Sequence, residues 1–389
     1  MKILFLSQRV PYPPNRGDKI TTWRLAERMA REHEVRIAAF AHDEADEKAA
    51  RDLEEMGFQV AIAKPRSKLA ALPALLTKTP ITRVVFGSRE LQRKVDAWID
   101  DMDLAYAYSS SMGAFFLPHD LPRVMHFAEL DSDKWTQYSK LKPFPMNWVY
   151  GREARTLLEF EKELAAKAAE CVFCTPLEQE VFERLIPGVD SLVMLNGVNL
   201  EKYQPAPERA EPGHMVFVGV MNYYPNVEGC EWFCEEILPR IQERVEGAHL
   251  SIVGAHPTPA IEALGNKPGV HVTGFVDDTV EWLERASVSI APLRVARGIQ
   301  NKVLEALAMG LPIVGTSSAT QGVGGVPGRD YLVEDTVEGQ VEAICGLLRD
   351  SDRAKELGKR GRTFAEEHHD WEVCLRPLDA ILAKYAPQS

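Results

Sequence analysis

Short apolar runs alternate with amphipathic stretches along most of this chain. The first series of runs is KILFLSQ, VRIAAFA, FQVAIAK, LAYAYSS, RVMHFAE and CVFCTP. Between them, residues 19–32 and 46–56 have the spacing of helices. Strands that are apolar on both faces are typical of a parallel sheet covered by helices on each side. The pattern therefore predicts an α/β fold.

A second series of the same kind starts at MVFVGV. A predicted helix at 227–244 follows, and then come the runs HLSIVGA, VHVTGF, VSIAPL and PIVGTS. The break between the two series, residues 196–214, contains Gly197, Pro205, Pro207 and Pro212. A chain of 389 residues is too long for one core. The sequence thus predicts two doubly wound Rossmann-like domains that face a central cleft, where ligands bind at the carboxyl ends of the strands.

The predicted boundaries follow from this break. We expect a first domain at 1–198, a linker at 199–213 and a second domain at 214–370. A C-terminal helix at 371–389 is expected to pack back on the first domain.

Composition excludes several classes of protein. The net charge of −12 argues against nucleic-acid binding. Residues 64–94 nevertheless hold eight basic residues and one acid, a charge of +8 − 1 = +7, with apolar residues between them. This segment is either a surface for anionic lipid or an ordinary solvated face. No run is long enough to span a membrane and the apolar start is too short for a signal peptide, so we expect a cytoplasmic protein. The six cysteines form no disulfide or metal pattern and are expected to be buried thiols.

The segment 294–315 holds the most specific chemistry. It predicts a loop with Gly298, a helix that carries Lys302 and Glu305, and a helix end at Gly310. The start of such a helix offers free N–H groups and the positive end of the helix dipole to a phosphate or diphosphate. Lys302 suits the diphosphate and Glu305 suits paired sugar hydroxyls, although the pair also fits a plain amphipathic helix surface.

A nicotinamide enzyme is the main rival for this architecture. It requires GxGxxG directly after a first strand. The loop SQRVPYPPNRGDK has one glycine, and VGVMNYYPNVEG lacks the spacing. A dehydrogenase is therefore not expected.

Several motifs together resemble glycosyltransferase family 4. They are the PxPxxxG loop near the N-terminus, NGV, FVGVMNYYPN, VTGFVDD and GIQNKVLEALAMG. DSDKWTQY and ARGIQNKVLEA narrow the resemblance to sugar transferases of bacterial exosortase and exopolysaccharide systems. The resemblance implies the GT-B fold and a retaining transferase. Such an enzyme moves a sugar from a UDP- or GDP-linked donor to a glycan or lipid-linked acceptor, in the cytoplasm or at the inner face of the plasma membrane.

The resemblance also assigns donor residues. Glu305 matches the second glutamate of the family's paired-glutamate motif and would hold the ribose, whereas the first glutamate falls at Arg297. Asn222 and Asn226 stand where many members have an Arg and a Lys for the diphosphate. The expected donor site consists of Gly17, Gly219, Asn222, Arg294, Arg297, Gly298, Ile299, Gln300, Asn301, Lys302 and Glu305.

In the first domain, Gly17 would let the backbone approach the diphosphate, and we expect Asp18 to cap the next helix. His126, at a strand end, is the family-like candidate near the reacting sugar, although such a histidine is more often structural. Asp131 is a second catalytic candidate. The acceptor candidates are Glu129, Asp133, Trp135 and Tyr138.

Two further hypotheses concern a bound metal ion and the type of activity. Asp131 and Asp133 form a DxD motif that could bind a metal ion. Because the GT-B fold that the resemblance implies needs no metal, no cofactor or metal is expected. Loss of turnover in the presence of EDTA would contradict this expectation. The alternatives to transfer are a sugar-nucleotide epimerase on the same fold and a catalytically silent GT-B scaffold.

Overall fold

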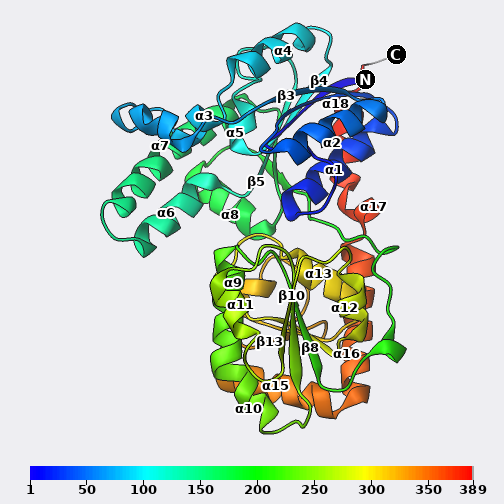
Figure 1. Cartoon of the computed structure of the whole chain (residues 1–389). Helices are drawn as coiled ribbons and strands as arrows, with labels where there is room; N and C mark the ends of the chain where they lie inside the picture. Colours follow the sequence, from blue (N-terminus) through cyan, green and yellow to red (C-terminus); the bar gives the residue numbers. More distant parts are fainter. Residues whose placement is uncertain (388–389) are drawn as a thin grey trace. The chain divides into compact units, whose positions relative to one another are not determined.

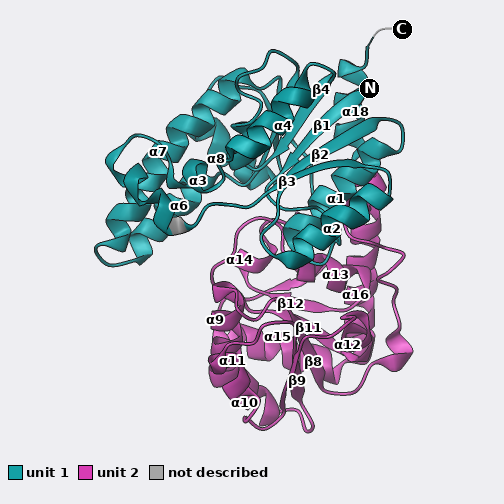
Figure 2. Cartoon of the chain, turned by 45° about the horizontal axis from the view of Figure 1, so that its top comes forward, with its two compact units in different colours: residues 1–195, 375–389 teal, residues 196–374 magenta. Residues whose placement is uncertain are grey.

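The computed structural model describes residues 1–387 and divides the chain into two compact units (Figures 1 and 2). The first unit contains residues 1–195 and the chain from residue 375 onward, and the second contains residues 196–374. Segment 199–213, expected to be a linker, lies within the second unit. The C-terminal helix expected at 371–389 is two helices, of which the first belongs to the second unit and the other to the first unit. Among residues 1–387 no helix is long and apolar enough to span a bilayer.

The first unit is built on a parallel sheet of seven strands in the order β3-β2-β1-β4-β5-β6-β7. Its strands are β1 (Lys2–Ser7), β2 (Glu34–Phe40), β3 (Gln59–Ala63), β4 (Leu104–Tyr108), β5 (Arg123–Ala128), β6 (Glu170–Phe173) and β7 (Ser191–Val193). Its helices are α1 (Gly17–Ala30), α2 (Glu44–Glu55), η1 (Lys68–Leu76), α3 (Ile81–Val85), α4 (Arg89–Ile99), α5 (Ser110–Gly113), α6 (Asp131–Leu141), α7 (Met146–Lys167), α8 (Pro176–Leu185) and α18 (Arg376–Tyr385).

The second unit is likewise built on a parallel sheet, which has six strands in the order β10-β9-β8-β11-β12-β13. Its strands are β8 (His214–Val218), β9 (His249–Val253), β10 (Val270–Gly274), β11 (Val288–Ala291), β12 (Ile313–Gly315) and β13 (Leu332–Val333). Its helices are η2 (Pro207–Arg209), α9 (Tyr224–Trp232), η3 (Phe233–Ile237), α10 (Leu238–Gln242), α11 (Pro259–Leu264), α12 (Val280–Arg285), α13 (Asn301–Ala308), α14 (Ser317–Thr320), α15 (Val337–Arg349), α16 (Ser351–His368) and α17 (Trp371–Cys374).

These sheets confirm the predicted α/β class with two doubly wound units. β4 shows why the prediction works, since all five of its residues are buried and its sequence is a continuous apolar run. Each unit has its own core. In both sheets the strand order reverses beside the first strand, between β1 and β4 and between β8 and β11, which is where ligands bind in such folds.

Local details confirm some predictions and correct others. Gly310 has φ +65 directly after α13, as expected of a helix end. Asp18 is not an N-cap: α1 begins at Gly17, its N-cap is Arg16, and the Asp18 carboxylate accepts a hydrogen bond from Arg16 Nε at 2.6 Å. The helix predicted at 227–244 is three pieces, because the π-turn η3 interrupts it. All six cysteines are free and buried, as predicted.

Candidate donor and acceptor sites

The loop before α13 is held in place by close backbone contacts. Gly298 has φ +61, a conformation that favours glycine. A Cβ at Gly322 would lie 2.4 Å from the Gly298 carbonyl oxygen, so the two segments touch through their backbones. The N-cap of α13, Gln300, makes no side-chain capping bond. The first N–H groups of α13 thus have no capping side chain and suit an anionic ligand.

Lys302 lies in the first turn of α13, with its ammonium group turned toward β8. Lys302 Nζ donates to Asn226 Oδ1 at 2.8 Å and lies 4.9 Å from the centre of the Phe217 ring. Burial lowers the pKa of Lys302 to about 8, because the surroundings solvate the cation poorly. The positive charge is held by an amide and an aromatic face, and a ligand phosphate would stabilise it further.

Glu305 lies one turn further along α13 and is half-buried. Burial raises its pKa to about 7, although the Tyr203 hydroxyl donates a hydrogen bond to the carboxylate and opposes the rise. Lys202, beside Tyr203, pairs with Asp278 at 3.1 Å. A carboxylate held in this way can accept hydrogen bonds from paired hydroxyls, as predicted for a ribose. Tyr203 was missed, because nothing in the sequence shows that its segment passes under α13.

The carboxyl end of β8 is shaped by two glycines. A Cβ at Gly219 would lie 2.7 Å from the Asn226 Nδ2 atom, and a Cβ at Gly254 would lie 1.7 Å from the Gly219 carbonyl oxygen. Asn226 is 3% exposed and also donates to the Val220 carbonyl oxygen at 2.9 Å. Asn226 therefore supports Lys302 from inside the fold, whereas Asn222, in the loop before α9, is exposed.

The two arginines expected at the diphosphate have different surroundings. Arg294 is ion-paired with Glu228, and its guanidinium lies 5.2 Å from the centre of the Trp232 ring, so it is held by α9. Arg297 is half-buried, and its carbonyl oxygen accepts from Gln300 Nε2 at 2.9 Å. Ile299 packs against the core and Asn301 begins α13. Arg297, residues 298–301 and Lys302 thus follow the carboxyl end of β11, inside the sheet order.

In the first unit, an internal cation joins two of the predicted acidic residues. Lys134 Nζ lies 2.5 Å from both Glu129 Oε1 and Asp131 Oδ1. These two carboxylates raise the pKa of Lys134 although burial opposes them, so Lys134 remains charged. The other Asp131 oxygen, Oδ2, accepts from Ser110 Oγ at 2.9 Å. The two oxygens of the Asp131 carboxylate are thus bonded to Lys134 and Ser110.

Two buried glutamates support the loop that carries this cluster. Glu161 Oε1 accepts from the Ser132 N–H at 3.2 Å, and Glu178 Oε2 accepts from the Leu130 N–H at 3.0 Å. Burial raises the pKa of Glu161 to about 8. Ala128, at the start of the loop, has φ +62, which is uncommon for a residue with a Cβ. The loop therefore depends on the helices α7 and α8 for its conformation.

His126 lies on β5, beside the two tyrosines of β4. Its side chain is completely buried, with Nδ1 hydrogen-bonded to the Tyr106 hydroxyl at 2.9 Å. Burial lowers its pKa to about 3, so the ring is neutral near pH 7. The prediction placed His126 at a strand end, but β5 continues to Ala128. This geometry favours the structural role over contact with a substrate.

The remaining predicted residues are more exposed to solvent than His126. Trp135 packs against Tyr150 at 4.9 Å and Tyr138 at 6.0 Å between ring centres, and both Trp135 and Tyr138 are half-buried. Asp133 Oδ2 accepts from Gln137 Nε2 at 2.8 Å. Gly17 is exposed at the start of α1.

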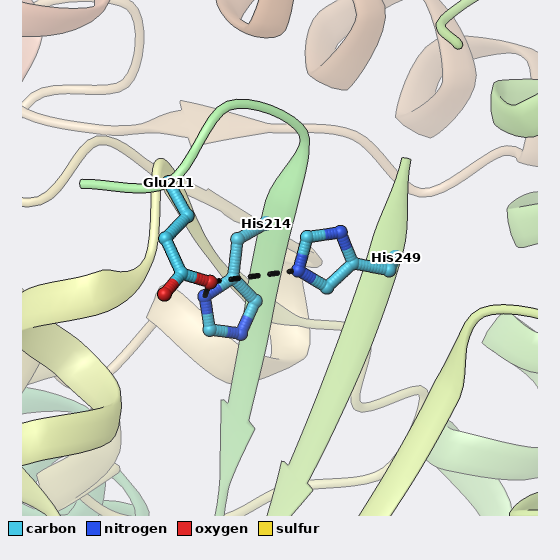
Figure 3. A group of neighbouring side chains, drawn as sticks. All are labelled: Glu211, His214 and His249. Carbon is cyan, nitrogen blue, oxygen red and sulfur yellow. Dashed lines mark ion pairs between the residues drawn. The ribbon is translucent and has the colours of Figure 1, made fainter. Parts of the chain in front are cut away.

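Figure 3 shows a separate cluster of Glu211, His214 and His249 at the amino ends of β8 and β9. These are residue types that bind metal ions. Both nitrogens of His214 are already in hydrogen bonds, Nδ1 with the Arg285 carbonyl oxygen at 2.9 Å and Nε2 with Ser251 Oγ at 2.8 Å. Arg285 Nε also donates to Glu211 Oε1 at 2.7 Å. We interpret the cluster as a bonded network that fastens the chain before β8 to the sheet.

Comparisons with known proteins match most of the second unit to a known family. Residues 212–350 match the model of the family described as glycosyl transferases group 1. A GDP-mannose-dependent alpha-(1-6)-phosphatidylinositol monomannoside mannosyltransferase of Mycobacterium tuberculosis is 33% identical over 165 residues, which are 37% of this chain and 42% of the relative. The match therefore spans less than half of the length of that relative.

Solved structures extend the comparison to the whole fold. Sucrose-phosphate synthase from Thermosynechococcus elongatus superposes with a TM-score of 0.71 at 15% identity, covering 100% of both chains. Anabaena HepE in complex with UDP has a TM-score of 0.72 at 16% identity, covering 99% of this chain and 100% of the other. At this identity the similarity concerns the fold alone. The chain thus has the GT-B fold, and its residues 212–350 match the glycosyl transferases group 1 family.

Proposed function

We propose that this protein is a retaining glycosyltransferase that uses a UDP- or GDP-sugar as donor. The acceptor is a glycan or lipid-linked glycan in bacterial exopolysaccharide biosynthesis, and the enzyme acts in the cytoplasm or at the inner face of the plasma membrane. The observation that carries the proposal is the pair Lys302 and Glu305, which lie near the open start of α13 with pKa values shifted by burial in opposite directions. Charged groups perturbed in this way gather at functional sites.

A nucleoside diphosphate matches these groups. Its phosphates accept from Lys302 and from the N–H groups of α13, where charge develops on the leaving group during transfer. Its ribose hydroxyls donate to the Glu305 carboxylate, and the negative phosphates favour the charged form of Lys302. The group 1 domain and a GDP-mannose-dependent relative support this assignment.

The donor sugar is assigned to the loop before α13. Arg297 stands where the family has a glutamate, so Gly298, Ile299, Gln300 and Asn301 remain to contact the sugar. For the acceptor, we assign Asp131 and Glu129, held by Lys134, with the nearby Trp135 and Tyr138 as stacking surfaces. Because Lys134 already supplies the cation between the two carboxylates, we propose that transfer needs no divalent metal.

A catalytically silent scaffold is the second candidate. It is favoured by Arg297 in place of the first glutamate and by Asn222 and Asn226 in place of an Arg and a Lys. A scaffold would bind nucleotide weakly or not at all and would leave the donor intact.

A thermal-shift panel of UDP, GDP, ADP and TDP, with and without Mg²⁺, tests the donor site. A nucleotide at about 100 times its Kd stabilises the protein by about 2.7 kcal/mol. We expect one nucleotide to raise the melting temperature without metal, and to lose this effect in Lys302→Met. No shift with any nucleotide would favour the scaffold. NMR of the product formed from the matching sugar donor then tests retention, since an inverted anomeric centre would contradict it.

A further inference from the structure

Exposed apolar side chains gather in two short segments of the first unit. Fifteen large hydrophobic side chains are exposed among the described residues, and seven of them lie in residues 69–76 and 141–148. They include Leu76 at 92%, Phe144 at 79% and Trp148 at 52% exposed. The others are Leu69, Leu72, Leu141 and Met146. We call residues 69–76, in η1, and residues 141–148, from the end of α6 to the start of α7, the apolar ridge.

The two segments of the ridge are joined through α7. Arg152 Nη2 donates to the carbonyl oxygens of Ala74 and Thr77, each at 2.5 Å, and Thr79, at 2.9 Å. The Glu153 carboxylate accepts from the N–H groups at the start of α3, at 2.7 and 2.8 Å. Both side chains are buried, so α7 holds η1 and α3 firmly. Figures 1 and 2 show α3, α6 and α7 at the same end of the unit.

Arg152 also relates the position of Trp148 to the end of η1. Trp148 is four residues before Arg152 on α7, so the two share a helix face about 6 Å apart along the axis. Arg152 binds the chain at Thr77, directly after Leu76. Arg152 thus joins the end of η1 to the first turns of α7, where the second ridge segment ends.

The charge around the ridge has one sign. Residues 64–89 and 134–152 contain no Asp or Glu, in a protein of net charge −12. Exposed basic side chains flank the apolar ones: Arg66, Lys78, Arg83, Lys140 and Lys142. Lys64 is paired with Glu47 at 2.7 Å. Protein interfaces are depleted in lysine, whereas aromatic and aliphatic side chains among Lys and Arg are typical of contact with an anionic bilayer.

We propose that the apolar ridge docks the first unit onto an anionic membrane surface. Leu76, Phe144 and Trp148 enter the headgroup region, and the lysines remain at the phosphate level. The inference does not rest on the proposed transfer reaction, because docking requires neither donor nor acceptor.

Vesicle sedimentation of the full chain tests the proposal. We expect binding to vesicles of phosphatidylcholine with 30% phosphatidylglycerol, weaker binding at high salt, and little binding to pure phosphatidylcholine. Each Lys near the surface contributes about 1 kcal/mol, so Lys78→Gln with Lys140→Gln should weaken binding about 30-fold. Leu76→Ser with Phe144→Ser should weaken it by at least about tenfold.

Matched controls lie elsewhere on the surface. Met56→Ser with Val326→Ser removes two side chains that are 48% and 47% exposed, and Lys355→Gln with Lys359→Gln removes two exposed lysines of α16. Both controls should bind as wild type. Equal binding to neutral and anionic vesicles, or an unchanged Leu76→Ser/Phe144→Ser variant, would overturn the proposal. The proposal would also be overturned if the wild-type protein is a dimer and the Leu76→Ser/Phe144→Ser variant is a monomer, because the ridge would then join two copies of the chain. The nucleotide thermal shift should be the same in all these variants, which separates this test from that of the donor site.

Discussion

Nucleotide affinity should fall as the pH rises through 8, because Lys302 loses its proton there in the empty site. Burial lowers its pKa from 10.5 to about 8. A bound diphosphate favours the charged form and returns the pKa toward its ordinary value. Between pH 7.5 and 9.5 the empty site then loses its charge while the filled site keeps it, which weakens binding about 20-fold. Calorimetric titration with the nucleotide at both pH values measures this difference.

The variant Lys302→Met tests whether the charge of Lys302 causes this pH dependence. Without the charge-assisted hydrogen bonds, affinity at pH 7.5 should fall by about 1.5–3 kcal/mol, or roughly 10- to 150-fold. The remaining affinity should be the same at pH 9.5. Lys355→Met, an exposed lysine on α16, should behave as wild type. Wild-type affinity and pH dependence in Lys302→Met would refute the reasoning.

The same pKa shift predicts the effect on stability. A lysine whose pKa is lower in the folded state destabilises the fold below pH 8, and this effect disappears as the pH rises toward 10.5. The shift corresponds to about 3 kcal/mol. Unliganded Lys302→Met should therefore have a higher free energy of unfolding than wild type at pH 7, and denaturant titration should show the excess shrinking above pH 8.

Three further variants test other parts of the site. Glu305→Gln should weaken nucleotide binding through the lost ribose contacts by about 1–2 kcal/mol while the free diphosphate binds as before; equal loss for pyrophosphate and nucleotide in calorimetry would contradict the ribose role. Gly254→Ala should lower the free energy of unfolding by at least about 3 kcal/mol because its Cβ meets the Gly219 carbonyl, whereas Gly247→Ala, with a positive φ but open space, should cost about 1 kcal/mol; equal effects in denaturant titration would disprove the close contact. His126→Phe should destabilise the fold by about 1–3 kcal/mol through the unpaired Tyr106 hydroxyl and leave transfer intact; a 100-fold loss of turnover in a folded variant would restore a catalytic role.

The sequence predicted the parts of the fold that depend on continuous burial. Strands such as β4 are apolar on both faces and can be recognised alone, whereas β7 and β13 were missed because they are short and half-buried. Gly310 was predicted from its place after an apolar helix. The prediction of Asp18 as the N-cap was wrong. α1 begins at Gly17 instead of at Lys19, and the sequence alone does not show which of these residues is the first of the helix.

The sequence groups only those candidate site residues that are close along the chain. Lys302 and Glu305 share one helix, so their spacing indicates a common face. Tyr203 and the contact of Asn226 with Lys302 depend on how distant segments pack against α13, which no periodic pattern encodes. The burial of His126 depends on the length of β5 and on the tyrosines of β4, which is why its place on a strand suggested a role that its surroundings do not favour.

The central claim is that the edge of the second unit at α13 binds a nucleoside diphosphate. A structure of the protein with the nucleotide that raises its melting temperature tests this most directly. We predict the diphosphate at Lys302 and the first N–H groups of α13, with the ribose hydroxyls on the Glu305 carboxylate. A nucleotide bound away from both side chains would contradict the account.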